Sequence, residues 1–255
     1  HEAVRVYERY VDEYPRPLDL AMETRTRLAE IFKSERLEDR YRDQLGAIVA
    51  LDNSAGGERT DRSRYLASQA ALVLAEDRFE AFASVQLVQP FEQSLAEKQR
   101  LMDEALIDFE VLTTYQVADV TAAATYYIAE IYYEFSDALL ASERPAGLSP
   151  AERLDYDMVI EEEAYPFEEQ AIEVHEKNFE LLAGGIFNPW VEQSLDRLTV
   201  LMPGRYARNE ISGGFMGSID SYAYRMPIAP PPGVDPQAPV DETTPAPEVA
   251  AQVAE

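Results

Sequence analysis

Histidine and cysteine, the side chains most often used for acid–base and nucleophilic chemistry, are nearly missing from this chain. It has no cysteine and two histidines, His1 and His175. Thiol catalysis, disulfides and thiolate metal sites are therefore excluded. A ferritin-like metal site needs a Glu three residues before the histidine, and Ile172 occupies that position. We expect His175 to be a surface or half-buried helical residue beside Glu173 and Glu176.

Carboxylates are the other side chains that could carry chemistry. Glu161, Glu162 and Glu163 are followed by Glu168 and Glu169, and such oxygens could hold a divalent cation. We expect the first three to end one helix and the last two to begin another, so that the helix dipole favours only the second pair. These five glutamates are better explained as a solvated helix face or as a docking patch for a basic partner. A carboxylate-rich helical metalloenzyme is a less favoured hypothesis.

Other catalytic motifs are absent from the sequence. Gly184-Gly185 and Gly213-Gly214 lack the spacing and the following Lys or Ser/Thr of a phosphate-binding loop, and no serine-hydrolase elbow occurs. The sequence therefore predicts a protein that is not an enzyme, with no cofactor and no metal ligands. A small-molecule ligand is not expected either.

Charge narrows the class of partner. The 255 residues include 48 acidic and 22 basic ones, which gives a formal net charge of -26. Binding nucleic acid through bulk charge requires a basic surface, so this function is excluded, and adhesion to anionic lipid is disfavoured by the same sign. Uncharged stretches such as residues 181–191 are shorter than the roughly 20 apolar residues of a membrane span. We expect protein partners that are basic and bound in a salt-sensitive way.

Proline and glycine mark the ends of the elements that must position these residues. The segment Ser149-Pro150-Ala151-Glu152 has the pattern of a capping box, and Asn188-Pro189 repeats the cap followed by Pro. Gly184-Gly185 supplies a left-handed helix stop. Tyr165-Pro166 and Gln89-Pro90 place Pro where a helix restarts after a short break.

Apolar residues recur at three- and four-residue steps between these marks, as on one face of a helix. Two such stripes are Val120, Ala124, Tyr127, Ile131, Phe135 and Leu139, and Leu87, Phe91, Leu95, Met102, Leu106 and Phe109. The pattern predicts helices over residues 2–14, 19–33, 35–51, 61–88, 91–116, 119–143, 150–164, 166–183 and 189–201. The predicted fold is all-α, built of antiparallel helical hairpins.

Two short spacings resemble the tetratricopeptide repeat. They are Ala3, Tyr7, Tyr10 and Pro15, which resemble the second helix of the repeat, and Ile128, Ala129 and Tyr132, which resemble its first helix. Helices near 61–88 and 91–116 are longer than that repeat has, and no clean 34-residue period runs through the middle. The resemblance implies a degenerate, elongated α-solenoid that continues before His1.

Longer segments, residues 59–76, 120–145 and 164–198, resemble the C-terminal part of large bacterial envelope repeat proteins. Those proteins are associated with Tol- or Exb-type energy-transducing systems and with gliding motility. The resemblance implies a non-catalytic protein–protein interaction scaffold in the periplasm or at the outer envelope, and it supplies no site residues. A cytosolic adaptor or co-chaperone of the same architecture is the alternative.

Two tyrosines are candidates for binding a protein. Tyr126 and Tyr133 are seven residues apart on the helix expected over 119–143. In one interpretation they cover a neighbouring helix while Tyr127 and Ile131 pack inward. In the other they line a concave groove and present aromatic rings to a peptide.

Composition changes after a helical domain expected at residues 1–210. Residues 211–255 are rich in Pro and Ala, with acidic residues and almost no basic ones, which predicts a largely disordered tail. Near its start, Tyr222, Tyr224 and Met226 alternate with other residues. This period of two suits a motif that adds a strand to a partner or folds back on the helical body, with a solvated linker as the third interpretation.

Overall fold

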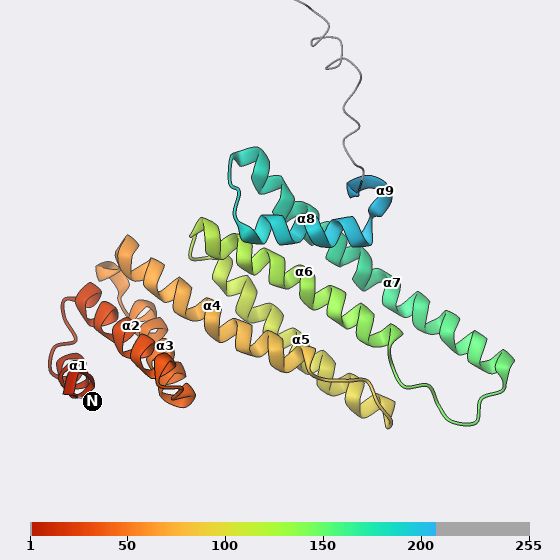
Figure 1. Ribbon diagram of the computed structural model, residues 1–255, viewed down its shortest axis with the longest axis horizontal. Coiled ribbons are helices and arrows are strands. Elements are labelled where there is room, and N and C mark those ends of the chain that lie inside the picture. The colour runs from red at the N-terminus through yellow and green to blue at the C-terminus, as the bar shows by residue number, and fades with distance from the viewer. Residues whose placement is uncertain (1, 208–255) are drawn as a thin grey trace, which may run out of the picture. The chain divides into compact units, whose positions relative to one another are not determined.

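The computed structural model describes residues 2–207, which form nine α-helices and two short 3-10 turns without a strand (Figure 1). The helices are α1 (Glu2–Glu13), α2 (Leu18–Ser34), α3 (Glu38–Asn53), α4 (Asp61–Ala83), α5 (Phe91–Thr113), α6 (Ala118–Leu140), α7 (Pro150–Glu180), α8 (Pro189–Leu201) and α9 (Pro203–Tyr206). The predicted all-α class is confirmed for these residues. The tail predicted over 211–255, with Tyr222, Tyr224 and Met226, lies outside the described residues.

The helices pack against their neighbours along the chain, and α2, α4, α6 and α8 also contact one another in turn. Glu76 of α4 meets Tyr127 of α6, and seven residues further on Ala83 and Glu134 line one pocket. Equal steps on both helices mean that α4 and α6 run in the same direction (Figure 1). The helices α3, α5 and α7 each pack against two members of this row.

The core follows the predicted stripes. Val120, Ala124 and Ile131 of α6 are fully buried, with Phe135 and Leu139 nearly so. The stripe that runs from Leu87 into α5 is buried at Leu87 and Phe109, and its other members pack against the same core. Each large apolar side chain removed from water in this way stabilises the fold by about 1.5–3 kcal/mol. Regular apolar spacing was therefore a sound guide to which helix faces pack.

Three of the predicted helix-end signals are confirmed. Ser149 Oγ accepts a hydrogen bond from the backbone N–H of Glu152, whose carboxylate accepts one from the N–H of Ser149. Asn188 Oδ1 accepts two backbone N–H groups at the start of α8. Gly185 has φ of 79°, the left-handed conformation in which glycine carries no steric penalty.

The break predicted at Tyr165-Pro166 is wrong, because α7 runs through Pro166 without interruption. Proline removes one backbone donor and leaves the carbonyl of Glu162 without its helical partner. Both residues lie on the exposed face of α7, so water can bind that carbonyl, while Ala164 and Phe167 keep the other face packed in the core. The acidic run at 161–169 is therefore the middle of one helix and not the junction of two.

A further helix boundary differs from the prediction. The helix predicted over 61–88 ends at Ala83, and residues 85–88 form an irregular loop.

Within residues 2–207, no helix is both long enough and apolar enough to cross a lipid bilayer.

Candidate protein-binding site

The helices α4 and α6, which pack against each other, both carry carboxylates at one-turn spacing. Glu76 and Glu80 lie one turn apart on α4, and Glu130, Glu134 and Asp137 lie at one-turn steps on α6. We call these five residues the acidic face. Because residues three or four apart share one side of a helix, each helix presents its carboxylates as a row.

Glu76 is a partly buried carboxylate in this face. The pKa of Glu76 is raised by burial and, more weakly, by the neighbouring charge of Glu80. Tyr127 Oη donates a hydrogen bond of 3.2 Å to Glu76 Oε1, which opposes the rise. The ring of Tyr127 stacks on Phe109 at 4.9 Å between centroids, so this hydroxyl is held in position by the core.

Glu134 of α6 is, like Glu76 of α4, a partly buried carboxylate. The pKa of Glu134 is raised by burial first and then by the charges of Glu130 and Asp137. Lys98 and Arg197 lower it only in part. A carboxylate with a raised pKa is held in an unfavourable environment for its charge, and an arriving cation would relieve that cost.

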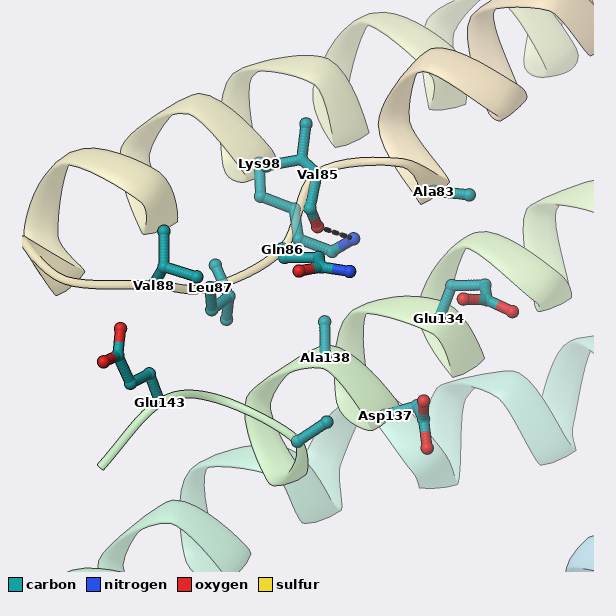
Figure 2. Close-up of a pocket in the computed structure, with 11 residues that line it drawn as sticks. Ala83, Val85, Gln86, Leu87, Val88, Lys98, Glu134, Asp137, Ala138 and Glu143 are labelled. Carbon is teal, nitrogen blue, oxygen red and sulfur yellow. Dashed lines mark hydrogen bonds between the residues drawn. The ribbon is translucent and has the colours of Figure 1, made fainter.

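A pocket of about 390 Å³ opens beside Glu134 and Asp137. Figure 2 shows it between the loop that carries Gln86 and Leu87 and the last turns of α6. Its walls combine apolar groups, such as Leu87, with carboxylates. This pairing of apolar walls with acidic rims suits a long side chain that has an aliphatic stem and a cationic end.

Lys98 fixes the loop that borders the pocket. It is fully buried, and its Nζ donates to the carbonyl oxygens of Val85 at 2.9 Å and Phe82 at 3.2 Å. Burial lowers the pKa of Lys98. Its ammonium is thus bonded to one carbonyl in the last turn of α4 and one just after that helix. The pocket carboxylate of Glu134 is only partly neutralised by it. From the other side, the backbone N–H of Glu143 donates to the carbonyl oxygen of Leu87 at 2.9 Å.

Glu130 is the deepest member of the acidic face, only 4% exposed. Arg197 Nε of α8 donates to Glu130 Oε1 at 2.8 Å, and His175 Nε2 of α7 lies 3.2 Å from the same oxygen. Burial raises the pKa of Glu130, but contact with His175 and Arg197 outweighs it and holds that pKa below its ordinary value. These three side chains tie α6, α7 and α8 together.

The expectation for His175 was therefore wrong in its burial. The imidazole is fully buried, and neither of its nitrogens makes a well-aligned hydrogen bond within the described structure. The nearby residues named from the sequence point elsewhere, since Glu173 pairs with Lys177 and Glu176 pairs with Arg205. The carboxylate that lies beside His175 belongs to Glu130, which is 45 positions away in the sequence, so local spacing could not identify it.

Tyr126 and Tyr133 both contact side chains of α8. Tyr126 is half-buried, and its ring centroid lies 5.5 Å from that of Trp190 and 5.7 Å from that of His175. The guanidinium of Arg197 lies 4.1 Å from the ring centroid of Tyr133. These contacts are those of helix packing, and a role for the two tyrosines in binding a protein stays a prediction. The ring of Trp190 also packs on that of Tyr127, with 5.4 Å between centroids.

Among residues 2–207, no three His, Asp or Glu side chains gather in a way that could hold a metal ion. Comparison of the chain with protein-family models, with curated proteins and with solved structures finds no match. The function must therefore be argued from the site itself.

Proposed function

We propose that this protein is a non-catalytic scaffold that binds a basic segment of a partner protein along the acidic face of α4 and α6. The observation that carries the proposal is the pocket of about 390 Å³ in which apolar side chains such as Leu87 lie beside the carboxylates of Glu134 and Asp137. Burial, which raises the pKa of Glu76 and of Glu134, supports it. Partly buried carboxylates without full neutralisation gain free energy when a Lys or Arg approaches. The pocket beside Glu134 would accept one such side chain.

The helix arrangement supports a repeat architecture of the tetratricopeptide type. If α1 is the second helix of a repeat, as its spacing suggests, then α2, α4, α6 and α8 are first helices. The separate first-helix spacing at residues 128–132 falls on α6, which agrees with that phase. The same four helices contact one another in a row, as first helices of stacked hairpins do. We include a degenerate α-solenoid in the proposal for these reasons.

The cell-envelope location is also part of the proposal, on the strength of the long segments that resemble envelope repeat proteins. In this setting the scaffold would serve a transport, energy-transducing or motility complex. Fractionation of the source cells tests this point separately. Recovery of the protein only with cytosolic markers would remove the location and leave the binding proposal intact.

Binding is tested by calorimetric titration of the full chain with a 12-residue peptide rich in Lys and Arg. The test variant Glu76→Gln/Glu134→Gln/Asp137→Asn removes three charges from the acidic face. The control Glu35→Gln/Glu180→Gln/Glu192→Gln removes three exposed charges elsewhere. At roughly 0.5 kcal/mol for each exposed or half-buried ion pair, the test variant should bind about tenfold more weakly.

The control variant separates a local site from the effect of the net charge of -26. It should bind within about twofold of the wild type, because screening weakens distant charges. Equal losses in both variants would show that the peptide responds to total charge and that the acidic face is no site.

A further inference from the structure

The first half of α7 has an exposed apolar surface. Leu154, Met158 and Tyr165 are 63%, 60% and 58% exposed, whereas Ile160 and Ala164 of the same helix are buried. These values are far above those of the core, and the three residues lie on one side of α7 because their spacings of 4 and 7 match whole helical turns.

The last helices contact α7 near its other end. Asn178 Nδ2 donates to the carbonyl oxygen of Trp190 and to Ser194 Oγ of α8. Glu176 accepts hydrogen bonds from Arg205 and Tyr206 around α9. In Figure 1 the earlier part of α7 extends beyond both helices. The surface around Leu154 is thus left without a packed neighbour among the described residues.

The order of residues on this surface follows a heptad. Met158, Tyr165 and Ile172 occur at seven-residue intervals, and the alternate positions hold Leu154, Glu161 and Glu168. Apolar residues at one position, with Leu154 followed by two glutamates at the other, make a seam that can pair with another helix and select that helix by charge. We call these six residues the α7 seam.

Carboxylates of the seam have no ion-pair partner among the residues that the structure describes. Glu161 and Glu168 form no ion pair with any of residues 2–207, nor does the neighbouring Glu162. Arg153 is the one Lys or Arg of α7 before Lys177. The charge around the seam is therefore almost wholly negative.

We propose that the α7 seam binds an amphipathic basic helix of a partner protein, with apolar residues against Met158 and Tyr165 and Lys or Arg against Glu161 and Glu168. The seam from Leu154 to Ile172 contains 19 residues and is about 27 Å long, which calls for a partner helix of similar length. This surface is separate from the acidic face, so the proposal stands or falls independently of the proposed function.

Electrostatic repulsion disfavours two other binding partners for the α7 seam, a second copy of the chain and the chain's own C-terminal segment. A second copy of the chain would place Glu161 and Glu168 of two seams against each other, which is destabilising. The chain's own residues 208–255 contain seven acidic residues and two basic ones, Arg208 and Arg225. Both occupants would therefore bring net negative charge to a seam that is itself acidic.

The test uses two synthetic peptides of three heptads, one with Leu and Lys at the two seam positions and one with Leu and Glu. Fluorescence anisotropy measures binding of each to the full chain and to the variant Glu161→Lys/Glu168→Lys. The Lys peptide should bind the wild type and lose about tenfold in affinity for the variant, as two attractions become repulsions. The Glu peptide should show the reverse preference.

Two controls keep the result interpretable. The variant Glu35→Lys/Glu180→Lys changes net charge equally at exposed sites away from the seam, and it should retain affinity for the Lys peptide within about threefold. The variant Met158→Ser/Tyr165→Ser changes exposed side chains, so the fold should persist in circular dichroism while the affinity falls about tenfold.

Three outcomes would overturn the proposal. One is an equal loss of affinity for the Lys peptide in both charge-reversal variants. Another is concentration-dependent dimerisation of the wild type that Met158→Ser/Tyr165→Ser abolishes, which would make a second copy the occupant. The third is tighter binding of the Lys peptide to a chain that ends at Glu210, by tenfold or more, which would make the chain's own tail the occupant.

Discussion

Replacing Glu130 by Gln should destabilise the protein more than any other single change of charge to amide in the acidic face. Glu130 is 4% exposed and joins α6 to Arg197 of α8 and to His175 of α7. Glutamine keeps the shape of the side chain but removes its charge. The guanidinium of Arg197 would then be left half-buried without a counter-charge.

The size of the effect follows from the burial of the two partners. Removing one member of a fully buried ion pair costs about 3–5 kcal/mol. The Arg197 side chain keeps 26% of its exposure, so water can solvate part of its charge, and we expect the lower end, about 3 kcal/mol. For a domain of this size such a loss lowers the melting temperature by roughly 6–12 °C.

The dependence on pH gives a second signature of the same pair. The pKa of Glu130 lies below its ordinary value of 4.5, so the ionised carboxylate stabilises the folded state. That contribution is complete at pH values above 4.5 and is lost as the pH falls through the lower, folded pKa. The difference in unfolding free energy between wild type and Glu130→Gln should therefore shrink as the pH falls below 4.5.

Urea unfolding followed by circular dichroism measures both quantities, and the double variant with Arg197→Met gives the coupling. Because the double variant leaves no unpaired guanidinium, it should be more stable than the sum of the two single losses by about 1–2 kcal/mol. A cost below about 1 kcal/mol for Glu130→Gln at pH 7, or simple additivity with Arg197→Met, would refute the assignment of a buried ion pair.

Three further changes have defined outcomes. Glu134→Gln should stabilise the fold by about 0.5 kcal/mol in urea unfolding at pH 7, because the raised pKa of Glu134 means that its charge is unfavourable in the folded state. This gain should vanish below pH 4.5, where the wild-type carboxyl is protonated, and a loss of stability at pH 7 would contradict a raised pKa. Lys98→Met should lower the free energy of unfolding by about 2 kcal/mol and speed amide hydrogen exchange in residues 84–88, because two carbonyl oxygens lose their donor. Unchanged exchange in residues 84–88 would contradict the conclusion that Lys98 fixes this loop. Pro166→Ala should stabilise the fold by about 1 kcal/mol, since the carbonyl of Glu162 regains a helical donor, and a fall in melting temperature would count against a continuous α7.

Local rules predicted most of the helices because the signals they use are local. The capping box at Ser149 begins a helix and the left-handed Gly185 ends one, whatever surrounds them. In the α6 stripe every residue except the partly buried Tyr127 is buried. Pro166 shows the limit of such rules. Its effect depends on which side of α7 meets the core, and that is a property of tertiary packing.

The Glu130 contacts could not be predicted by spacing, because Glu130, His175 and Arg197 come from three helices far apart in sequence. One local signal was present all the same. Glu130 stands between Ala129 and Ile131 in an apolar helix, and a buried carboxylate requires a cationic or donor partner. A charged residue inside an apolar stripe therefore indicates a partner even where the sequence does not identify it.

A photo-cross-linking amino acid placed at Gln86 in the full chain, in the source cells, tests most directly whether the acidic face binds a protein. Gln86 is exposed at the rim of the pocket, and Gln93, exposed on α5, is the control position (Figure 2). We predict one dominant protein adduct from position 86 that disappears when Glu134→Gln and Asp137→Asn are added, and no such adduct from position 93. Adducts of equal strength at both positions, or an adduct at 86 that survives the loss of both charges, would contradict the proposed function.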